Sequence, residues 1–401
     1  MIAPARLAAY EVVRRVFEQE AYADRAFGSA AAKLDARDRG LAQRIAYGTI
    51  QRARVLDHGI EAFGKRPVRK LDPPVLAALR IAAYQLGWLD QVPAHAVAND
   101  SVELVRRARL ERAVPFTNAV VRRLAEGFRG LLGSLPDGPL KLSYPDWIAE
   151  VWERDLGREE ALALMRAQNE APETVVRLVR GEVDGEETEI PGAYRVARVD
   201  DTALAEGRIW PQSRGSQLAG LCVGSREGER TLDLCAAPGG KTTMLDGEVV
   251  AVELHAARAR ELEENARRLG ATNVRVVNAD GRDLPAELSA FDHALVDAPC
   301  SGLGVLATRP DLRWRAKPLP ELQLELVRAA AERLRPGGTL LYSVCTLNTD
   351  ENEAVVDASG LAVEPLGDEW PAFRHPRRPE FLLTLPHRDR TSGFFIARLR
   401  A

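Results

Sequence analysis

Two cysteines stand in short motifs that suit joint chemistry. The first lies in Asp297-Ala-Pro-Cys300-Ser-Gly, and the second, 45 residues further on, lies in Ser343-Val-Cys345-Thr-Leu-Asn348. Each motif follows an apolar run that predicts a parallel strand, so both thiols should lie beyond strand ends at one edge of a sheet. An acidic residue beside one cysteine, with a second cysteine nearby, can attack an electron-poor ring. We therefore expect one cleft that holds Asp297, Cys300 and Cys345.

A glycine turn upstream predicts a cofactor in the same cleft. The segment Leu232-Asp-Leu-Cys-Ala-Ala-Pro-Gly-Gly-Lys-Thr242 reads as a strand, a tight turn and a helix start, which is typical of nucleotide-like cofactors. Glu253 ends the next expected strand, where a carboxylate can accept from ribose hydroxyls, and Asp280 follows the third and can accept from an adenine amino group. The turn contributes Cys235, Ala236, Ala237, Pro238, Gly239, Gly240 and Lys241. Lys241 either orients the site or anchors the turn.

Alternating strands and helices are expected after about residue 206. Helical stretches separate the strand candidates, which predicts a doubly wound, mostly parallel sheet. The candidates are 231–234, 247–252, 274–277, 293–296 and 339–342. Such a sheet binds ligands beyond the carboxyl ends of its strands, where the motifs fall.

The N-terminal region is basic and reads as a bundle of helices. Residues 1–127 hold 21 Lys and Arg against 14 Asp and Glu, although the whole chain has a net charge of −3. Apolar residues recur at helical spacing, and Asp72-Pro73 predicts the cap and first turn of one helix. A basic bundle on an acidic body indicates contact with a phosphate backbone. Arg122 and Arg123 are candidates for that contact, or else lie on a solvated helix face.

These patterns divide the 401 residues into three parts. Residues 1–127 form the helical domain, 128–205 form a connecting α+β subdomain, and 206–401 form the catalytic α/β domain. Proline- and glycine-rich turns near residue 135 separate the first part from the second.

The motifs resemble known families in both halves of the chain. The two cysteine motifs and the glycine turn resemble the RNA cytosine-5 methyltransferases of the Sun (RsmB) family, as do segments 212–219, 309–314 and 387–399. Segments 38–50, 79–86 and 116–124 resemble the NusB-type RNA-binding bundle over most of residues 5–126. The resemblance implies a NusB-like bundle, a small α+β subdomain and a Rossmann-like methyltransferase domain.

The Sun family resemblance also implies an activity and roles. The chain would transfer a methyl group from S-adenosyl-L-methionine to carbon-5 of a cytosine in 16S ribosomal RNA, as a monomer. Cys345 would bond to carbon-6, Cys300 would assist proton removal and release, and Asp297 would hold the ring and border the cofactor. Arginines near the first cysteine would meet phosphate: Arg309, Arg313 and Arg315.

Two departures from the family pattern concern the cofactor. Glu253 stands where the family usually has aspartate, which lengthens the arm by one methylene. Seven residues separate Lys241 from Val249, which leaves room for barely two helical turns where the family has a longer helix. We expect the departures to affect cofactor affinity rather than cofactor identity.

Composition limits the other possibilities. No apolar run approaches a bilayer span and no signal peptide is recognisable, so we expect a cytoplasmic protein without membrane contact. Cys222 and Cys235 are expected to be small core residues, and the six scattered histidines predict no metal site.

Other functions remain open from the sequence. The substrate could be tRNA or another RNA. A DNA cytosine-5 methyltransferase would use Cys300 as nucleophile and leave Cys345 unexplained. A non-catalytic NusB-like protein would leave the second half unexplained, and a nicotinamide dehydrogenase fits the glycine turn alone.

Overall fold

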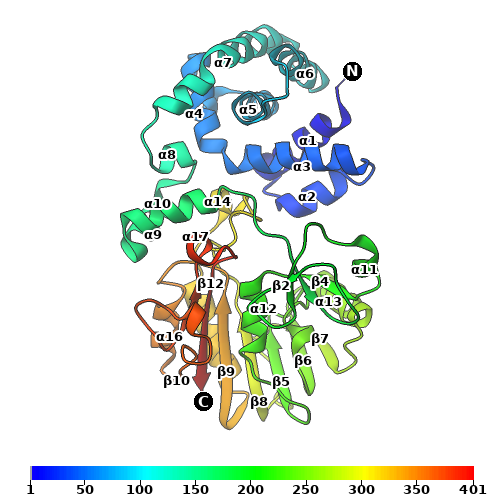
Figure 1. The fold of residues 1–401 in the computed structure, drawn as a ribbon, viewed down its shortest axis with the longest axis vertical. Helices are drawn as coiled ribbons and strands as arrows, with labels where there is room; N and C mark the ends of the chain where they lie inside the picture. The colour runs from blue at the N-terminus through cyan, green and yellow to red at the C-terminus, as the bar shows by residue number, and fades with distance from the viewer. Residues whose placement is uncertain (1) are drawn as a thin grey trace. The chain divides into compact units, whose positions relative to one another are not determined.

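The computed structural model describes residues 2–401, which form two compact units (Figure 1). Unit 1 runs to Asn169 and includes Leu306–Arg315, and unit 2 comprises Glu170–Val305 and Ala316–Ala401. These units cross the expected boundaries at residues 127 and 205. The reason is local packing, because residues after 134 bond to the preceding helices: Val55 N donates to Ser143 Oγ (3.2 Å), and Gln51 Nε2 donates to Gln168 O (3.0 Å).

Unit 1 is helical, as its apolar periodicity predicts. Its long helices are α1 (Pro4–Gln19), α2 (Ala23–Ala30), α3 (Ala36–Gln51), α4 (Ala53–Gly64), α5 (Pro73–Trp88), α6 (Ala94–Arg107) and α7 (Val114–Ser134). They are followed by α8 (Pro139–Leu142), α9 (Asp146–Leu156), α10 (Arg158–Ala167) and, far along the chain, α14 (Leu312–Arg315). Small residues dominate the core, which lets the helices approach closely; Tyr84 is buried in it and stacks on Trp88.

The predicted start of α5 is confirmed, with Asp72 at the N-cap position and proline at the first helical position. Asp72 precedes Pro73, yet its side chain makes no capping hydrogen bond. Both Pro73 and Pro74 lack an N–H group, and the first available amide, Val75 N, donates to the backbone oxygen of Asp72 at 2.9 Å. The fixed proline φ angle therefore starts this helix without a side-chain cap.

Unit 2 contains two sheets. A small antiparallel sheet has the order β2-β3-β1-β4, built from β1 (Val175–Leu178), β2 (Glu186–Glu187), β3 (Ala193–Arg195) and β4 (Ile209–Pro211), with α11 (Asp201–Ala205) before β4. The large sheet has the order β10-β12-β9-β8-β5-β6-β7, and β11 pairs with β12 (Figure 1). The predicted doubly wound sheet is confirmed.

The large sheet is parallel from β7 to β9 and antiparallel beyond β9. Its strands are β5 (Arg230–Leu234), β6 (Glu248–Glu253), β7 (Val274–Asn278), β8 (Phe291–Asp297), β9 (Leu334–Val344), β10 (Ala362–Glu364), β11 (Leu382–Thr384) and β12 (Phe394–Arg400). The helices of this part are α12 (Arg214–Leu221), α13 (Ala256–Leu269), α15 (Pro320–Ala331), α16 (Glu353–Ser359) and α17 (Pro386–Asp389). Central strands are buried along their length, which explains their continuous apolar runs.

No helix among residues 2–401 combines the length and apolar character that a membrane crossing requires.

Asp233 gives the catalytic unit a specific pH dependence. Burial in β5 raises the pKa of this carboxyl to about 7; one oxygen accepts from Thr242 Oγ1 at 2.7 Å and the other has no partner. Because the folded pKa exceeds the unfolded value, the protonated form favours folding below about pH 4, and that stability is lost as pH rises towards 7. We expect a loss of about 1.4 kcal/mol per pH unit between these limits, absent in Asp233→Asn.

Urea unfolding at pH 5, 6, 7 and 8 measures this effect as the difference between the wild type and Asp233→Asn. Asp246→Asn, which changes an exposed aspartate two residues before β6, is the control and should keep the wild-type pH profile. Parallel pH profiles for the wild type and Asp233→Asn would contradict the assignment.

Candidate functional site

The predicted catalytic residues meet at the carboxyl ends of β8 and β9. These strands are parallel, and the register pairs Asp297 with Ser343. Ser343 Oγ donates to Asp297 Oδ1 at 2.8 Å, and Ala298 N donates to Ser343 O at 3.1 Å. The two cysteine motifs therefore leave the sheet side by side.

The two thiols are in contact. Cys300 Sγ and Cys345 Sγ are 3.4 Å apart, within hydrogen-bonding distance for sulfur. Gly304 N donates to Cys345 O at 3.0 Å, and Gly393 N donates to Gly304 O at 2.8 Å. A Cβ on Gly304 would lie 2.1 Å from Gly393 O, so only glycine lets these backbones approach. The loops thus hold both sulfurs together, as the spacing predicts.

The cysteines differ in their tendency to ionise. The hydrogen bond to Cys345, together with burial, raises the pKa of Cys300 well above its usual range. Cys300 therefore keeps its proton at neutral pH. Burial raises the pKa of Cys222 and of Cys235 to about 12, so these thiols stay protonated.

Lys241 joins the glycine turn to Asp297. Its Nζ lies 2.7 Å from Asp297 Oδ2 and 5.0 Å from the centre of the Phe394 ring. Lys241 is almost fully buried, so this ion pair is shielded from solvent on one side. Both oxygens of Asp297 are thus bonded, one to Lys241 and one to Ser343. Ser343 and Phe394 were not singled out from the sequence, although both lie inside quoted motifs.

The glycine turn is a tight cradle after β5. Gly239 has φ +103°, a conformation that L side chains rarely adopt, and a Cβ on Gly240 would lie 2.9 Å from Trp210 Nε1. The turn, Glu253 at the end of β6 and Asp280 after β7 lie at the carboxyl ends of neighbouring parallel strands. Such an edge, with carboxylates that accept hydrogen bonds, fits a cationic nucleoside cofactor.

The two carboxylates predicted to bind the cofactor are held differently. Glu253 is buried; its Oε1 accepts from His255 N at 2.9 Å, and its Oε2 lies 3.6 Å from Arg258. Asp280 is paired with Arg282, which lowers the pKa of Asp280 to about 2. Asp280 is therefore a charged hydrogen-bond acceptor throughout the neutral range.

The segment after Lys241 is as short as the sequence predicts. It forms only a 3₁₀ turn, Thr242–Met244, before β6 begins. Arg177 of β1 supports this turn, because its Nη1 donates to Gly240 O (3.1 Å) and its Nη2 donates to Thr243 Oγ1 (2.7 Å). Burial lowers the pKa of Arg177 to about 10, so it stays charged at neutral pH. Nothing in the sequence pattern pointed to this arginine.

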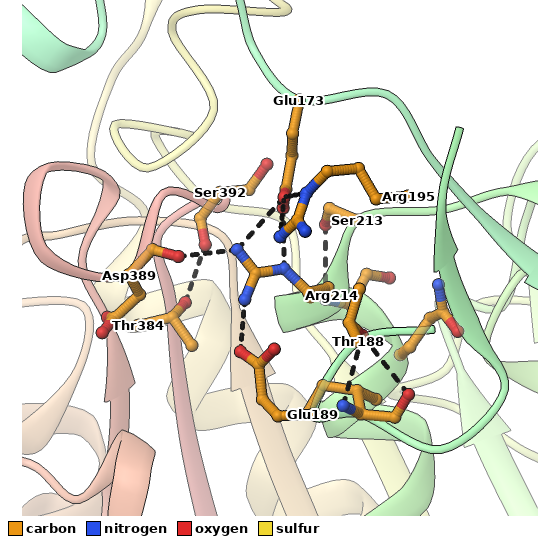
Figure 2. Close-up of polar contacts among 12 residues, drawn as sticks. Glu173, Thr188, Glu189, Arg195, Ser213, Arg214, Thr384, Asp389 and Ser392 are labelled. Carbon is orange, nitrogen blue, oxygen red and sulfur yellow. Dashed lines mark hydrogen bonds and ion pairs between the residues drawn. The ribbon is translucent and has the colours of Figure 1, made fainter. Parts of the chain in front are cut away.

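Arg214 anchors the segment 212–219. Figure 2 shows its guanidinium between Glu173, Glu189 and the backbone oxygen of Asp389. The distance from Nε to Glu173 Oε1 is 2.9 Å, and that from Nη2 to Asp389 O is 2.6 Å. The Arg214 side chain is 4% exposed and the Glu173 side chain is 12% exposed. This ion pair is therefore a largely desolvated junction within unit 2.

The arginines predicted to meet RNA lie in unit 1 and fall into two groups. Arg122 and Arg123 are exposed on α7, and Arg309 and Arg315 are partly exposed with their guanidinium groups over the Tyr22 ring. Arg313 differs, because it is 1% exposed and donates to Gln51 O (3.1 Å) and Gln168 O (2.9 Å).

Arg313 also lies 3.9 Å from the centre of the Tyr144 ring. These contacts make Arg313 a buried packing residue of unit 1, which leaves its guanidinium no exposed surface for the predicted phosphate contact. Among residues 2–401, no group of three His, Cys, Asp or Glu side chains is placed to hold a metal ion.

Comparison with known proteins places the two parts of the chain. Residues 221–400 match the family model described as 16S rRNA methyltransferase RsmB/F, and residues 3–126 match the NusB family. A protein of Synechocystis named as a probable ribosomal RNA small subunit methyltransferase B is 32% identical, over 99% of each chain. The ribosomal RNA small subunit methyltransferase B of Thermus thermophilus is 35% identical, over 91% of this chain and 89% of that one.

A solved structure shares the fold. The crystal structure of PH0851 covers 100% of this chain and 99% of its own, with a TM-score of 0.84 and 24% identity.

The Arg214 junction predicts unequal costs for two arginine substitutions. Arg214→Met leaves the largely buried Glu173 without its main partner, so we expect about 3 kcal/mol of destabilisation. Arg195→Met removes a 40% exposed partner of the same glutamate and should cost below about 1 kcal/mol. Chemical unfolding of both variants measures the two losses of unfolding free energy. Equal losses would show that the Arg214–Glu173 pair contributes no more than an exposed ion pair.

Proposed function

Because the chain belongs to the family of 16S rRNA methyltransferases RsmB/F, we propose that it methylates carbon-5 of a cytosine in small-subunit ribosomal RNA with S-adenosyl-L-methionine. The methyl transfer proceeds through a covalent bond between Cys345 and the ring. The observation that carries this proposal is the contact of two thiols, 3.4 Å apart, beside Asp297.

Cytosine carbon-5 is a poor nucleophile, which explains the need for a thiolate. Addition of Cys345 to carbon-6 turns the ring into an enamine whose carbon-5 can attack a methyl group. Asp297 accepts a hydrogen bond from the exocyclic amine, and one from N3–H once N3 has taken up a proton from solvent to offset the negative charge that thiolate addition gives the ring. The pairing of Asp297 with Ser343 and Lys241 keeps its carboxylate oriented for this task.

Release of the product needs a base. When Cys345 is bonded to carbon-6 it no longer carries a charge, which removes the first cause of the raised pKa of Cys300. Cys300 can then lose its proton to solvent, and its thiolate can take the proton from carbon-5. The electrons of that C–H bond re-form the ring double bond, and the bond from carbon-6 to sulfur breaks to return the Cys345 thiolate.

The cofactor residues are those of the strand edge. S-adenosylmethionine supplies an electrophilic methyl group when it is bound. Glu253 would accept from the ribose hydroxyls, Asp280 would accept from the adenine amino group, and the backbone of 235–241 would hold the methionine part. Asp297 would border the same space.

Unit 1 provides the RNA-binding surface in this proposal. The excess of cations in residues 1–127 and the match to the NusB family support it. Arg122 and Arg123 offer exposed charges, and Arg309 and Arg315 combine charge with the Tyr22 ring. These groups suit phosphates and unpaired bases.

The first prediction from this function concerns cofactor affinity. Glu253→Ala or Asp280→Ala should raise the Kd of S-adenosylmethionine roughly tenfold or more, with saturated turnover less affected, because both carboxylates act far from the methyl group. Calorimetry measures the Kd, with NAD as a control ligand that should not bind. Wild-type affinity in both variants would remove these residues from the site.

The second prediction separates the two thiols. Cys345→Ala should abolish both methyl transfer and any covalent RNA adduct, whereas Cys300→Ala should stop turnover but trap RNA on Cys345. A denaturing gel with labelled RNA shows the adduct as a shifted band, which should also be missing in the double variant. An adduct in Cys345→Ala but not in Cys300→Ala would reverse the roles and favour the arrangement of DNA cytosine-5 methyltransferases.

A further inference from the structure

A buried glutamate links the two cysteine loops. Glu351 lies in the turn that precedes α16 and is 0% exposed. Its Oε1 accepts from Ser301 N at 2.9 Å, from Leu319 N at 3.1 Å and from Gln323 Nε2 at 3.0 Å. Two backbone N–H groups and a side-chain amide thus donate to one oxygen of Glu351, which makes this oxygen a fully used hydrogen-bond acceptor.

The other oxygen reaches both loops at once. Ser301 Oγ donates to Glu351 Oε2, Thr346 Oγ1 lies 3.5 Å from the same atom, and the two hydroxyl oxygens are 2.7 Å apart. Ser301 directly follows Cys300, and Thr346 directly follows Cys345. One carboxylate therefore holds the residue after each thiol.

The turn that carries Glu351 is itself fixed. Tyr342 Oη donates to Glu351 O at 2.6 Å, which ties the turn back to β9. Gln323 Nε2 also donates to Pro299 O at 2.8 Å, on the other side of Cys300. A buried charge with this many partners costs much more to remove than a surface ion, so the arrangement has little freedom to relax.

We propose that Glu351 is a positioning residue that fixes the distance between the Cys300 and Cys345 loops and places its carboxylate next to the Cys300 side of the pair. The proposal rests on the cysteine chemistry of the proposed function. Glu351 touches neither sulfur and acts through Ser301 and Thr346.

Electrostatics supports the same assignment. After Cys345 and burial, the negative charge of Glu351 is a further cause of the raised pKa of Cys300. The other titratable groups near the pair are Tyr342, Asp297 and the Lys241 that neutralises Asp297. Glu351 has no cation among its hydrogen-bond partners, which are neutral groups, so its charge stays effective at Cys300.

Glu351→Gln keeps the shape of the side chain and removes the charge. We expect the pH of half-maximal alkylation of Cys300 by iodoacetamide, measured by mass spectrometry, to fall by about one unit. We also expect kcat to fall about tenfold or more, while the Kd of S-adenosylmethionine changes less than twofold. Cys222 and Cys235 are internal controls whose alkylation should not change.

Glu353→Gln is the matched control. Glu353 lies two residues further on, is also buried, and pairs with His375 Nε2 at 2.8 Å instead of with the cysteine loops. It should leave the alkylation midpoint of Cys300 and kcat unchanged. An unchanged midpoint and wild-type kcat in Glu351→Gln would overturn the proposal, and so would an equal midpoint shift in both variants.

A pair of hydroxyl substitutions decides the case if Glu351→Gln does not fold. Ser301→Ala and Thr346→Val each remove one loop contact and leave the backbone donors in place. Their effects on kcat should be non-additive, because both act through the same carboxylate, and additive effects would contradict the link. The alkylation readout needs no RNA, so a failed methylation assay would reject the proposed function and leave the role of Glu351 testable.

Discussion

The parallel pairing of β8 with β9 is the constraint on which the site depends. It sets Asp297 beside Ser343 at the last paired position, and every later contact follows from that register. Because each cysteine follows its strand end within three residues, the two sulfurs are brought into contact. A slip of one residue would turn Ser343 to the opposite face and separate the loops. The buried apolar faces of both strands prevent that slip, because it would exchange core residues for their neighbours.

Charge placement is the second requirement, because the strand edge gathers several carboxylates. Two are paired with a cation, Asp297 with Lys241 and Asp280 with Arg282, whereas Glu351 is held by neutral donors. Asp233 accepts one hydrogen bond, from the Thr242 hydroxyl, and this bond does not offset the effect of burial, which raises its pKa. Cation pairing thus offsets the charges of Asp297 and Asp280. Glu351 has no such cation among its hydrogen-bond partners, and its charge raises the pKa of Cys300.

The sequence predicted what local pattern encodes. Strand positions followed from apolar runs, and the meeting of Cys300 with Cys345 followed from their place after two strands. Partners chosen by packing could not be predicted. Glu351 is 50 residues from Ser301, and Arg313 donates to carbonyls more than 140 residues away. Arg313 lies in the segment Leu306–Arg315, which belongs to unit 1, whereas the chain before and after this segment belongs to unit 2. Its place after the first cysteine motif therefore did not indicate its partners.

The short segment after Lys241 shows how a missing element is compensated. In a longer helix the carbonyls of the first turn would accept from amides four residues on. Here Thr243 N still reaches Gly239 O at 3.0 Å, but the bond to Gly240 O comes from Arg177 at 3.1 Å. One arginine of the small antiparallel sheet thus replaces a backbone donor, and it stays charged although buried. The cofactor turn therefore depends on the small sheet, which sequence reasoning treats as a connecting subdomain, and the Arg214 junction binds that sheet to the C-terminal hairpin.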